Sequence, residues 1–280
     1  MLPEGVLKIS KDERFILWAE LQRGRLHVLE QGANGGLITR KNIPISIGLN
    51  GYGKEQEGDK RTPVGLYRLT SFLDDDRLID YYGLGAYPLN YPNALDRRLQ
   101  RTGSGIWLHG LPKDVDQRPP LDSAGCVIVD NTSLLEMADY IDPGVTHIVL
   151  TEGELRWQPE AAVRARRQSL ETAFERWRES WAAKDNAAYL SYYSQDFDSP
   201  TRNKAQWDAY KTRVNSAKSS IHVDVSNVSF FVHPEAPELV SIRYYQRYRS
   251  NNYKWNGWKE QLWQEEDAGG WRIVYEGNGG

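Results

Sequence analysis

Two side chains near the middle of the chain have the chemistry of a nucleophile and its base. Cys126 is the single cysteine among 280 residues, and a short polar loop separates it from His109. A thiol has an unperturbed pKa of about 8.5, so it needs a base or a cationic neighbour to react as a thiolate at neutral pH. His109 is the nearest candidate in sequence. The pair therefore predicts nucleophilic catalysis through a covalent intermediate.

The residues around this pair favour catalysis over a structural role. A lone cysteine is commonly a small buried hydrophobe, so a packing role is the first alternative. Here Gly110 follows the histidine and Gly125 precedes the cysteine, and glycine lets the backbone approach a reactive group closely. Ser123 lies just upstream of the thiol. We therefore expect Cys126, His109, Gly125, Ser123 and Gly110 to form one catalytic site.

The pair lies on short apolar runs that are typical of strands. Residues 106–109 precede the loop and residues 126–129 follow it, so two neighbouring strands would bring the thiol and the imidazole together. Asp130-Asn131-Thr132 has the composition of an N-cap for a helix over residues 133–141. Further strands are predicted at residues 15–18, 25–30, 43–48, with Pro44 at a sheet edge, and 145–150.

Two segments of this β-rich part carry a family resemblance. His109-Gly110, a spacer and Ser123-Ala124-Gly125-Cys126 resemble the active-site signature of the L,D-transpeptidases (YkuD type), in which a His, a spacer and Ser/Thr-His-Gly-Cys are commonly followed by Arg. The segment from Gly58 to Tyr67 resembles the Gly-Asp-x-x-Thr-Pro-x-Gly-x-Tyr segment that borders the substrate cleft in that family.

The chain departs from the signature at two places. Ala124 replaces the second histidine, and Val127-Ile128-Val129 stands where the arginine is expected. These departures resemble the YafK-like branch and the L,D-carboxypeptidases that set helical cell shape. The nucleophile and the base are kept, while the preferred acyl acceptor is left open.

The resemblance implies two-step acyl transfer on peptidoglycan stem peptides. Cys126 would cleave the stem between the third-position diamino acid and D-Ala, forming a thioester that passes its acyl group to an amine or to water. The Gly110 carbonyl would orient the imidazole, and the N–H groups of Gly125 and Cys126 would face the developing oxyanion. The alternatives are a strict L,D-carboxypeptidase that trims tetrapeptides to tripeptides for cell-shape control, release of proteins attached to peptidoglycan, and a non-catalytic peptidoglycan-binding scaffold.

Residues 81–101 are rich in aromatic residues, proline and asparagine, without a regular periodicity. A loop of this length is commonly functional, so we interpret the segment as a long loop or lid over the substrate cleft. Arg101, Tyr87 and Tyr91 are the predicted substrate-binding residues. The alternative is a surface loop that packs on itself.

The composition changes at residues 151–158, which predicts a linker between two domains, at 1–155 and 160–280. After Pro159, apolar residues recur at helical spacing, and two shorter helices and then several alternating strands follow. This order resembles an NTF2-like (SnoaL-like) cone. The predicted fold is thus a mainly β L,D-transpeptidase-like catalytic domain followed by an α+β NTF2-like domain. The tryptophans of the NTF2-like domain could line a pocket that binds sugar rings. Alternatively, they fill the core or a homodimer face, and we favour this second interpretation.

Composition excludes several other functions. A net charge of −3 gives no reason to expect nucleic acid, and no cluster has metal-ligand spacing, so neither a metal nor another cofactor is expected. The P-loop-like run at Gly48 puts Glu55 where a phosphate site needs Ser or Thr, so we expect no nucleotide. Residues 1–10 do not resemble a signal peptide. The family implies a periplasmic protein, whose signal peptide would be absent from this numbering.

Overall fold

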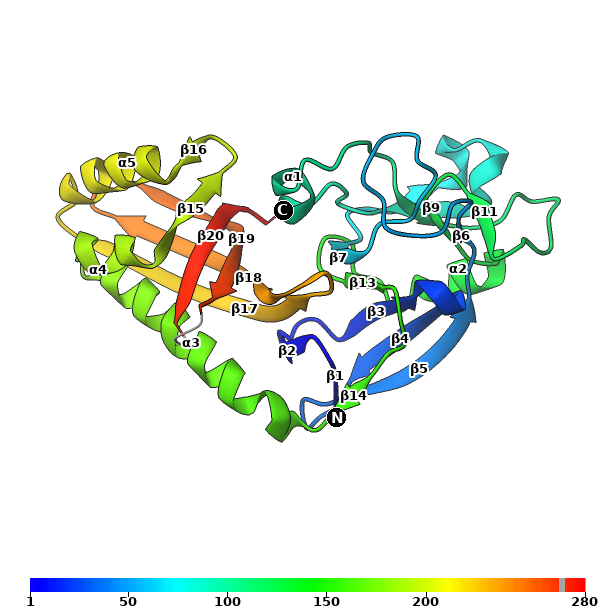
Figure 1. Ribbon diagram of the computed structural model, residues 1–280, viewed down its shortest axis with the longest axis horizontal. Coiled ribbons are helices and arrows are strands. Elements are labelled where there is room, and N and C mark those ends of the chain that lie inside the picture. Colours follow the sequence, from blue (N-terminus) through cyan, green and yellow to red (C-terminus); the bar gives the residue numbers. More distant parts are fainter. Residues whose placement is uncertain (267–269, 280) are drawn as a thin grey trace. The chain divides into compact units, whose positions relative to one another are not determined.

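The computed structural model describes residues 1–266 and 270–279 (Figure 1). Its contacts divide the chain into two compact units. The first comprises Met1–Glu4 and Glu13–Trp157, and the second comprises Gly5–Asp12 and Gln158–Gly280. Residues 5–12 therefore group with the second unit, although they precede most of the first unit in sequence.

A five-stranded mixed sheet forms one side of the first unit. β13 pairs with β3 in parallel and with β7 in antiparallel fashion, and β3, β4 and β5 form an antiparallel meander. β5 lies at the edge, where the missing N–H of Pro44 does no harm, but this strand ends at Pro44, so the single strand predicted at residues 43–48 is interrupted. In spatial order the strands are β5 (Leu37–Pro44), β4 (Arg25–Gln31), β3 (Phe15–Glu20), β13 (His147–Thr151) and β7 (Gly65–Arg68).

A second, four-stranded sheet contains His109, and Cys126 directly precedes one of its strands. Its central strand β10 pairs in parallel with β12 and in antiparallel fashion with β9. In order the strands are β12 (Val127–Ile128), β10 (Trp107–His109), β9 (Gly85–Pro88) and β8 (Leu73–Asp74). Short pairs complete the unit: β6 (Ile47–Gly48) with β11 (Leu121–Ser123), and β1 (Leu2–Pro3) with β14 (Trp157–Gln158).

The prediction of one long irregular loop at residues 81–101 is wrong. The segment contains the end of the 3-10 helix η3 (Asp80–Tyr82), strand β9 and helix α1 (Ala94–Arg98). A capping box starts α1, because the Asn93 side chain accepts from the Asp96 N–H at 2.9 Å and the Asp96 carboxylate accepts from the Asn93 N–H at 3.0 Å. The other short helices are η1 (Leu21–Arg23), η2 (Asp75–Arg77) and α2 (Asn131–Met137).

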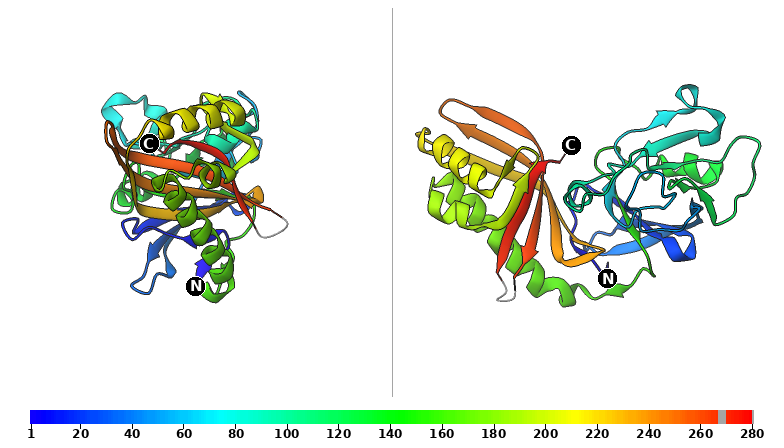
Figure 2. Two further views of the ribbon diagram at one scale, coloured as in Figure 1. Left: turned by 90° about the vertical axis from the view of Figure 1, so that its left-hand side faces the viewer. Right: turned by 45° about the horizontal axis from the view of Figure 1, so that its top comes forward.

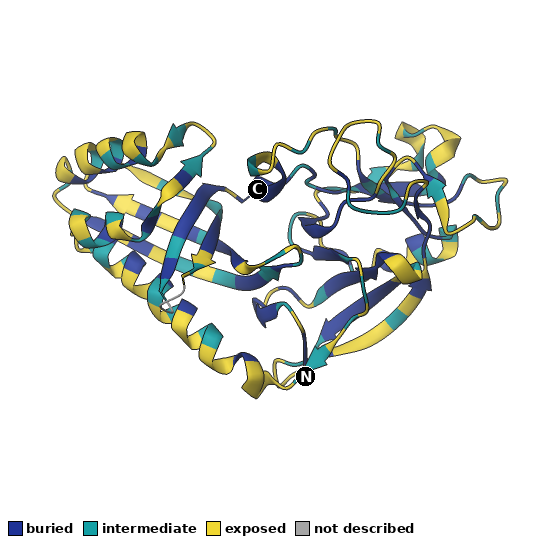
Figure 3. Cartoon of the chain, viewed as in Figure 1, coloured by how far each residue is buried: buried dark blue, intermediate teal, exposed yellow. Residues whose placement is uncertain are grey.

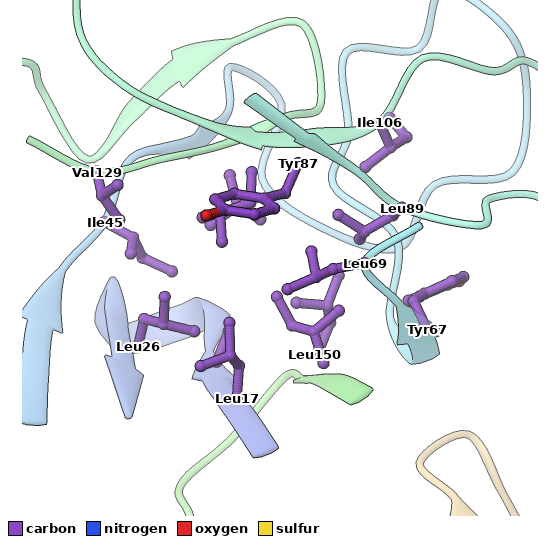
Figure 4. Close-up of a cluster of buried hydrophobic side chains, with 14 of the residues drawn as sticks. Leu17, Leu26, Ile45, Tyr67, Leu69, Tyr87, Leu89, Ile106, Val129 and Leu150 are labelled. Atoms are coloured by element: carbon purple, nitrogen blue, oxygen red, sulfur yellow. The ribbon is translucent and has the colours of Figure 1, made fainter. Parts of the chain in front are cut away.

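The core of the first unit is made largely of aliphatic side chains from both sheets (Figure 4). Leu17, Leu26 and Leu150 come from the five-stranded sheet, and Leu108 from the four-stranded one. Tyr87 lies among these aliphatic side chains (Figure 4). Of the predicted N-cap residues, Asp130 caps α2, since its carboxylate accepts from the Ser133 N–H at 2.9 Å, and the helix runs from Asn131 to Met137 instead of from 133 to 141. This packing fixes the strands that carry His109.

The second unit is a seven-stranded sheet whose helices lie against one of its faces (Figure 2). The long helix predicted after Pro159 is confirmed, and its buried residues are Val163, Leu170, Phe174, Trp177 and Trp181. In order the strands are β16 (Arg202–Asn203), β15 (Tyr193–Ser199), β20 (Trp271–Asn278), β19 (Lys254–Glu265), β18 (Ala236–Ser250), β17 (Ile221–His233) and β2 (Val6–Lys8). The helices are α3 (Glu160–Ala182), α4 (Asn186–Ser191) and α5 (Lys204–Ser216).

Burial follows these elements (Figure 3). The inner strands β3, β4, β7 and β13 are largely buried, while the edge strand β5 and the solvent-facing stripe of α3 are largely exposed. The predicted fold, a mainly β unit followed by an α+β unit, is confirmed. None of the helices in the described part of the chain has the length and apolar content that crossing a bilayer requires.

Candidate active site

The parallel pairing of β10 with β12 brings the predicted nucleophile and base into one region. Leu108 lies opposite Val127 and His109 opposite Ile128, so Cys126, directly before β12, lies beside the start of β10. The ring of Tyr82 contacts the His109 ring, and Cys126 contributes to raising the pKa of the Tyr82 hydroxyl, after the larger effect of burial. The two sequence-predicted residues therefore share one site.

The His109 imidazole is arranged as a neutral base. The side chain is fully buried, and Nδ1 lies 2.7 Å from the Gly110 carbonyl oxygen, which can only accept. The proton therefore sits on Nδ1, and Nε2 is left without a hydrogen-bond partner in the described part of the chain. Burial lowers the pKa of His109 to about 4, and the charge of Arg118 lowers it further against the opposing bond to Gly110. An unprotonated Nε2 is the atom that a general base needs.

The Cys126 thiol is likewise neutral at rest. Its Sγ lies 3.5 Å from the Gly105 carbonyl oxygen, to which the thiol donates. Burial raises the pKa of Cys126, although a backbone N–H of Trp107 acts in the opposite direction. A neutral thiol and a neutral imidazole favour proton transfer during attack over a preformed thiolate–imidazolium pair.

Ser123 holds the turn that presents the thiol. Its buried hydroxyl donates to the Cys126 carbonyl at 2.7 Å and accepts from the Gly125 N–H at 3.0 Å. The Gly125 N–H is therefore occupied, and the expectation that it faces an oxyanion is corrected. The Cys126 N–H makes no hydrogen bond among residues 1–266 and 270–279, so it is the remaining donor of the predicted pair.

Gly125 also closes a link to the Gly58–Tyr67 segment. Gly125 has φ of +125°, and a Cβ there would lie 2.7 Å from the Arg61 carbonyl oxygen. The fully buried Thr62 donates through Oγ1 to the Gly125 carbonyl at 3.0 Å and accepts from the Gly48 N–H at 2.9 Å. The second sequence motif thus contacts the turn that holds the nucleophile.

A close approach explains the glycine after the histidine. A Cβ on Gly110 would lie 2.1 Å from Oδ1 of Asn131. Asn131 uses this oxygen to accept from the Leu84 N–H at 3.3 Å, and its Nδ2 donates to the Leu111 carbonyl at 2.9 Å. Asn131 therefore braces both segments that flank the imidazole, a role that its type alone did not indicate.

Aromatic rings and one cation surround the histidine. The Tyr82 centroid lies 5.0 Å from that of His109 and 4.7 Å from that of Trp107. The Tyr81 centroid lies 5.8 Å from His109, and the Arg118 guanidinium lies 5.0 Å from the Tyr81 ring. No role was predicted for Tyr82 or Arg118. Their signal was weak, since both lie in polar or irregular segments.

The three predicted substrate-binding residues have other partners. Tyr87 and Tyr91 belong to the hydrophobic core, where Tyr91 donates to the Thr102 carbonyl at 3.0 Å. Arg101 pairs with the buried Asp96 at 3.2 Å. The structure gives these residues packing and ion-pair roles, and it places Tyr81, from the start of the same segment, beside His109. The tyrosine-rich composition of the segment could not show which tyrosines pack in the core and which lie beside His109.

The second unit contains a cavity of about 630 Å³. Its lining combines aromatic rings with charges: Trp181, Trp207, Tyr210, Tyr248, Trp255, Lys211, Lys259 and Glu276. Lys211 lies 4.2 Å from the Trp181 ring, and burial lowers the pKa of its amine to about 8. Trp177, Trp263 and Trp271 are instead fully buried. Tryptophans of the second unit therefore contribute both to a core and to the pocket. In the described part of the chain, no group of three or more His, Cys, Asp or Glu side chains could hold a metal ion.

Comparison with known proteins agrees with both units. The model of the L,D-transpeptidase catalytic domain (YkuD) matches residues 6–150, and that of the Cds6 C-terminal NTF2-like domain matches residues 169–277. The chain therefore belongs to the L,D-transpeptidase family, and it carries an NTF2-like domain behind the catalytic domain. The resemblance noted in the sequence is confirmed.

Two solved structures resemble the whole chain. Bd1075 of Bdellovibrio bacteriovorus is 29% identical, with 99% of this chain and 97% of that chain covered and a TM-score of 0.80. Pgp2 of Campylobacter jejuni, described as a helical cell shape determining protein, is 25% identical, with 98% and 96% covered and a TM-score of 0.78. A search of curated proteins finds no match.

Proposed function

We propose that this protein is a cysteine acyltransferase that cleaves peptidoglycan stem peptides between the third-position diamino acid and D-Ala. The proposal rests on one observation above all. The buried imidazole of His109 is held by the contact of its Nδ1 with the Gly110 carbonyl oxygen. Its Nε2 therefore has no hydrogen-bond partner among the described residues, and it lies in the same region as Cys126. Membership of the L,D-transpeptidase family supports the substrate class.

The first half-reaction forms a thioester. Nε2 of His109 takes the proton of the Cys126 thiol as Sγ attacks the carbonyl carbon of the diamino acid. The tetrahedral oxyanion lies within reach of the Cys126 N–H, and such a donor is typically worth about 2.7–4 kcal/mol. Collapse breaks the C–N bond, and the departing D-Ala amine takes the proton from His109. Histidine is neutral again when the acyl group remains on sulfur.

The second half-reaction decides between two activities. Water that gives a proton to His109 hydrolyses the thioester, and the proton then returns to the sulfur as it leaves, which amounts to L,D-carboxypeptidation. An amine from a second stem would give a cross-link instead. We favour water, because Ala124 and Val127 to Val129 depart from the transpeptidase signature towards the carboxypeptidase branch. The cell-shape description of Pgp2 is in line with a trimming role and a periplasmic location.

Mass analysis of a disaccharide tetrapeptide tests this proposal. We expect the wild type to release D-Ala and leave a tripeptide, and we expect Cys126→Ala to release none. A cross-linked dimer would identify a transpeptidase. If the wild type forms no product, and neither a carbapenem nor a thiol reagent labels Cys126 selectively at neutral pH, the protein is a non-catalytic scaffold.

A second site supports a binding role for the second unit. Its cavity offers tryptophan and tyrosine faces of the kind that stack on sugar rings, together with the cation of Lys211. We propose that this cavity holds part of a peptidoglycan strand while domain 1–155 acts on the stem peptide. A homodimer through domain 160–280 stays a prediction that sedimentation would check.

A further inference from the structure

Arg118 is a cation with unused hydrogen-bonding capacity beside the candidate site. Its side chain is only 14% exposed, and its Nε pairs with Asp122 at 3.2 Å. Its Nη1 is buried and has no hydrogen-bond partner in the described part of the chain. The guanidinium lies 5.0 Å from the ring of Tyr81, which packs against it.

A buried N–H donor without a partner destabilises the protein unless a ligand accepts its hydrogen bond. A guanidinium presents its N–H donors in a planar fork that suits a carboxylate, and a buried donor without a partner carries its full desolvation cost. Asp122 meets only one edge of the fork, and its own side chain is 41% exposed. The free protein therefore keeps an N–H donor that an anionic ligand could satisfy with a charge-assisted bond.

The position of Arg118 relates this donor to the reaction. Tyr81 lies near both residues, with its ring centroid 5.8 Å from that of His109 and 5.0 Å from the Arg118 guanidinium. The Arg118 charge is also among the causes that lower the pKa of His109. His109 delivers its proton to the amine of the departing amino acid, and the α-carboxylate of that amino acid is only one carbon atom from this amine.

We propose that Arg118 binds the free α-carboxylate of the residue to be removed and thereby selects stems that end at that residue. The inference rests on the proposed function and adds its specificity determinant. No cation follows Cys126 directly, because Val127, Ile128 and Val129 are buried apolar residues. Arg61 is the competing cation, since its backbone contacts the nucleophile turn at Gly125, but its side chain is exposed.

The test compares two tetrapeptide stems that differ only at the terminus, one with free D-Ala and one with D-alaninamide. A charge-assisted hydrogen bond is worth enough to predict that the wild type prefers the acid by about 10- to 100-fold in kcat/KM. In Arg118→Gln we expect the acid to fall to the level of the amide, while the amide changes by less than about twofold. Arg118→Lys should keep part of the preference. The matched control Arg61→Gln should keep all of it.

Iodoacetamide, a small neutral probe, reports on the fold and on the nucleophile independently of substrate. We expect Arg118→Gln to alkylate Cys126 at the wild-type rate and to keep its thermal midpoint. If this variant does not fold, Arg118→Lys carries the comparison.

The outcomes separate the two proposals. An equal loss on both substrates, a wild type without preference, or a preference lost only in Arg61→Gln overturns the role of Arg118 alone. A wild type that cleaves neither stem overturns the proposed function, and with it this inference.

Discussion

At the scale of single residues, the state of His109 sets the pH range of the reaction. Burial lowers its pKa to about 4, whereas an ordinary imidazole titrates near 6.5. A general base must be unprotonated, so it is competent above the pKa and is lost as the pH falls through about 4. We expect kcat/KM for a tetrapeptide to stay high at pH 5 to 6, where an ordinary histidine would already be half or more protonated. A profile whose acid limb lies near 6.5 would contradict this assignment.

Ser123 makes a second prediction at this scale. Ser123→Ala removes the bonds to the Cys126 carbonyl and to the Gly125 N–H, and it leaves both groups buried without that partner. Such a loss typically costs about 1–3 kcal/mol, and it loosens the turn that aims the thiol. We expect a lower midpoint in urea and a fall in kcat of about 10- to 100-fold, on the premise that misplacing a reacting atom by an ångström can cost this much. Ser216→Ala, an exposed serine in the second unit, is the control, and wild-type values for both variants would exclude the role.

The reactive residues could be predicted from the sequence, but their local hydrogen-bond partners could not. That Cys126 and His109 lie in one region followed from residue types and spacing, and the contact of the Gly110 carbonyl with the imidazole was implied by the family resemblance. The occupied Gly125 N–H did not, because a side chain two positions upstream takes the donor, and sequence does not show where that hydroxyl points. The same limit applies to Arg118, whose only sequence context is a polar loop.

At the scale of elements, Thr62 joins the loop of residues 48–62 to the nucleophile turn. Thr62→Val keeps the shape of the side chain but removes its bonds to the Gly48 N–H and the Gly125 carbonyl. Since the site is fully buried, we expect a loss of about 1–3 kcal/mol in the free energy of unfolding together with a lower kcat. Thr62→Ser retains the hydroxyl and should recover most of the activity. Equal activity in Thr62→Val and the wild type would mean that the turn is held without this link.

Element prediction succeeded where one periodicity dominates. The spacing of Val163, Leu170, Phe174, Trp177 and Trp181 predicted the buried face of α3. It failed at residues 81–101, because β9 and α1 are too short to show a period and Tyr87 of β9 is buried in the core. β15 was missed for a related reason, since only Tyr193 and Phe197 are buried in a polar strand.

At the scale of the whole molecule, the order of the chain differs from the order of its units. Val6–Lys8 forms β2, which pairs with β17 at the edge of the second sheet. A composition change marks the junction near residue 157, but nothing in the first residues indicates that they belong to the other unit. Three residues carry too little periodicity to select a partner strand so distant in sequence. The boundaries 1–155 and 160–280 therefore describe order along the chain, while the contacts include this exchanged segment.

The last prediction follows from the separation of the two sites between the units. Every residue assigned to the reaction lies in the first unit, whereas Lys211 lies in the cavity of the second. We expect Lys211→Met to hydrolyse a soluble tetrapeptide at the wild-type rate but to bind and trim insoluble peptidoglycan at least about tenfold less well, because the loss of one desolvated cation–π or charged contact is of that order. Lys254→Met, at an exposed position of β19, is the matched control.

Because burial lowers the pKa of Lys211 to about 8, binding by wild type should also weaken as the pH rises through that value, and Lys211→Met should lack this dependence. Equal losses on soluble and insoluble substrates would show that Lys211 supports the fold and not the binding of the polymer.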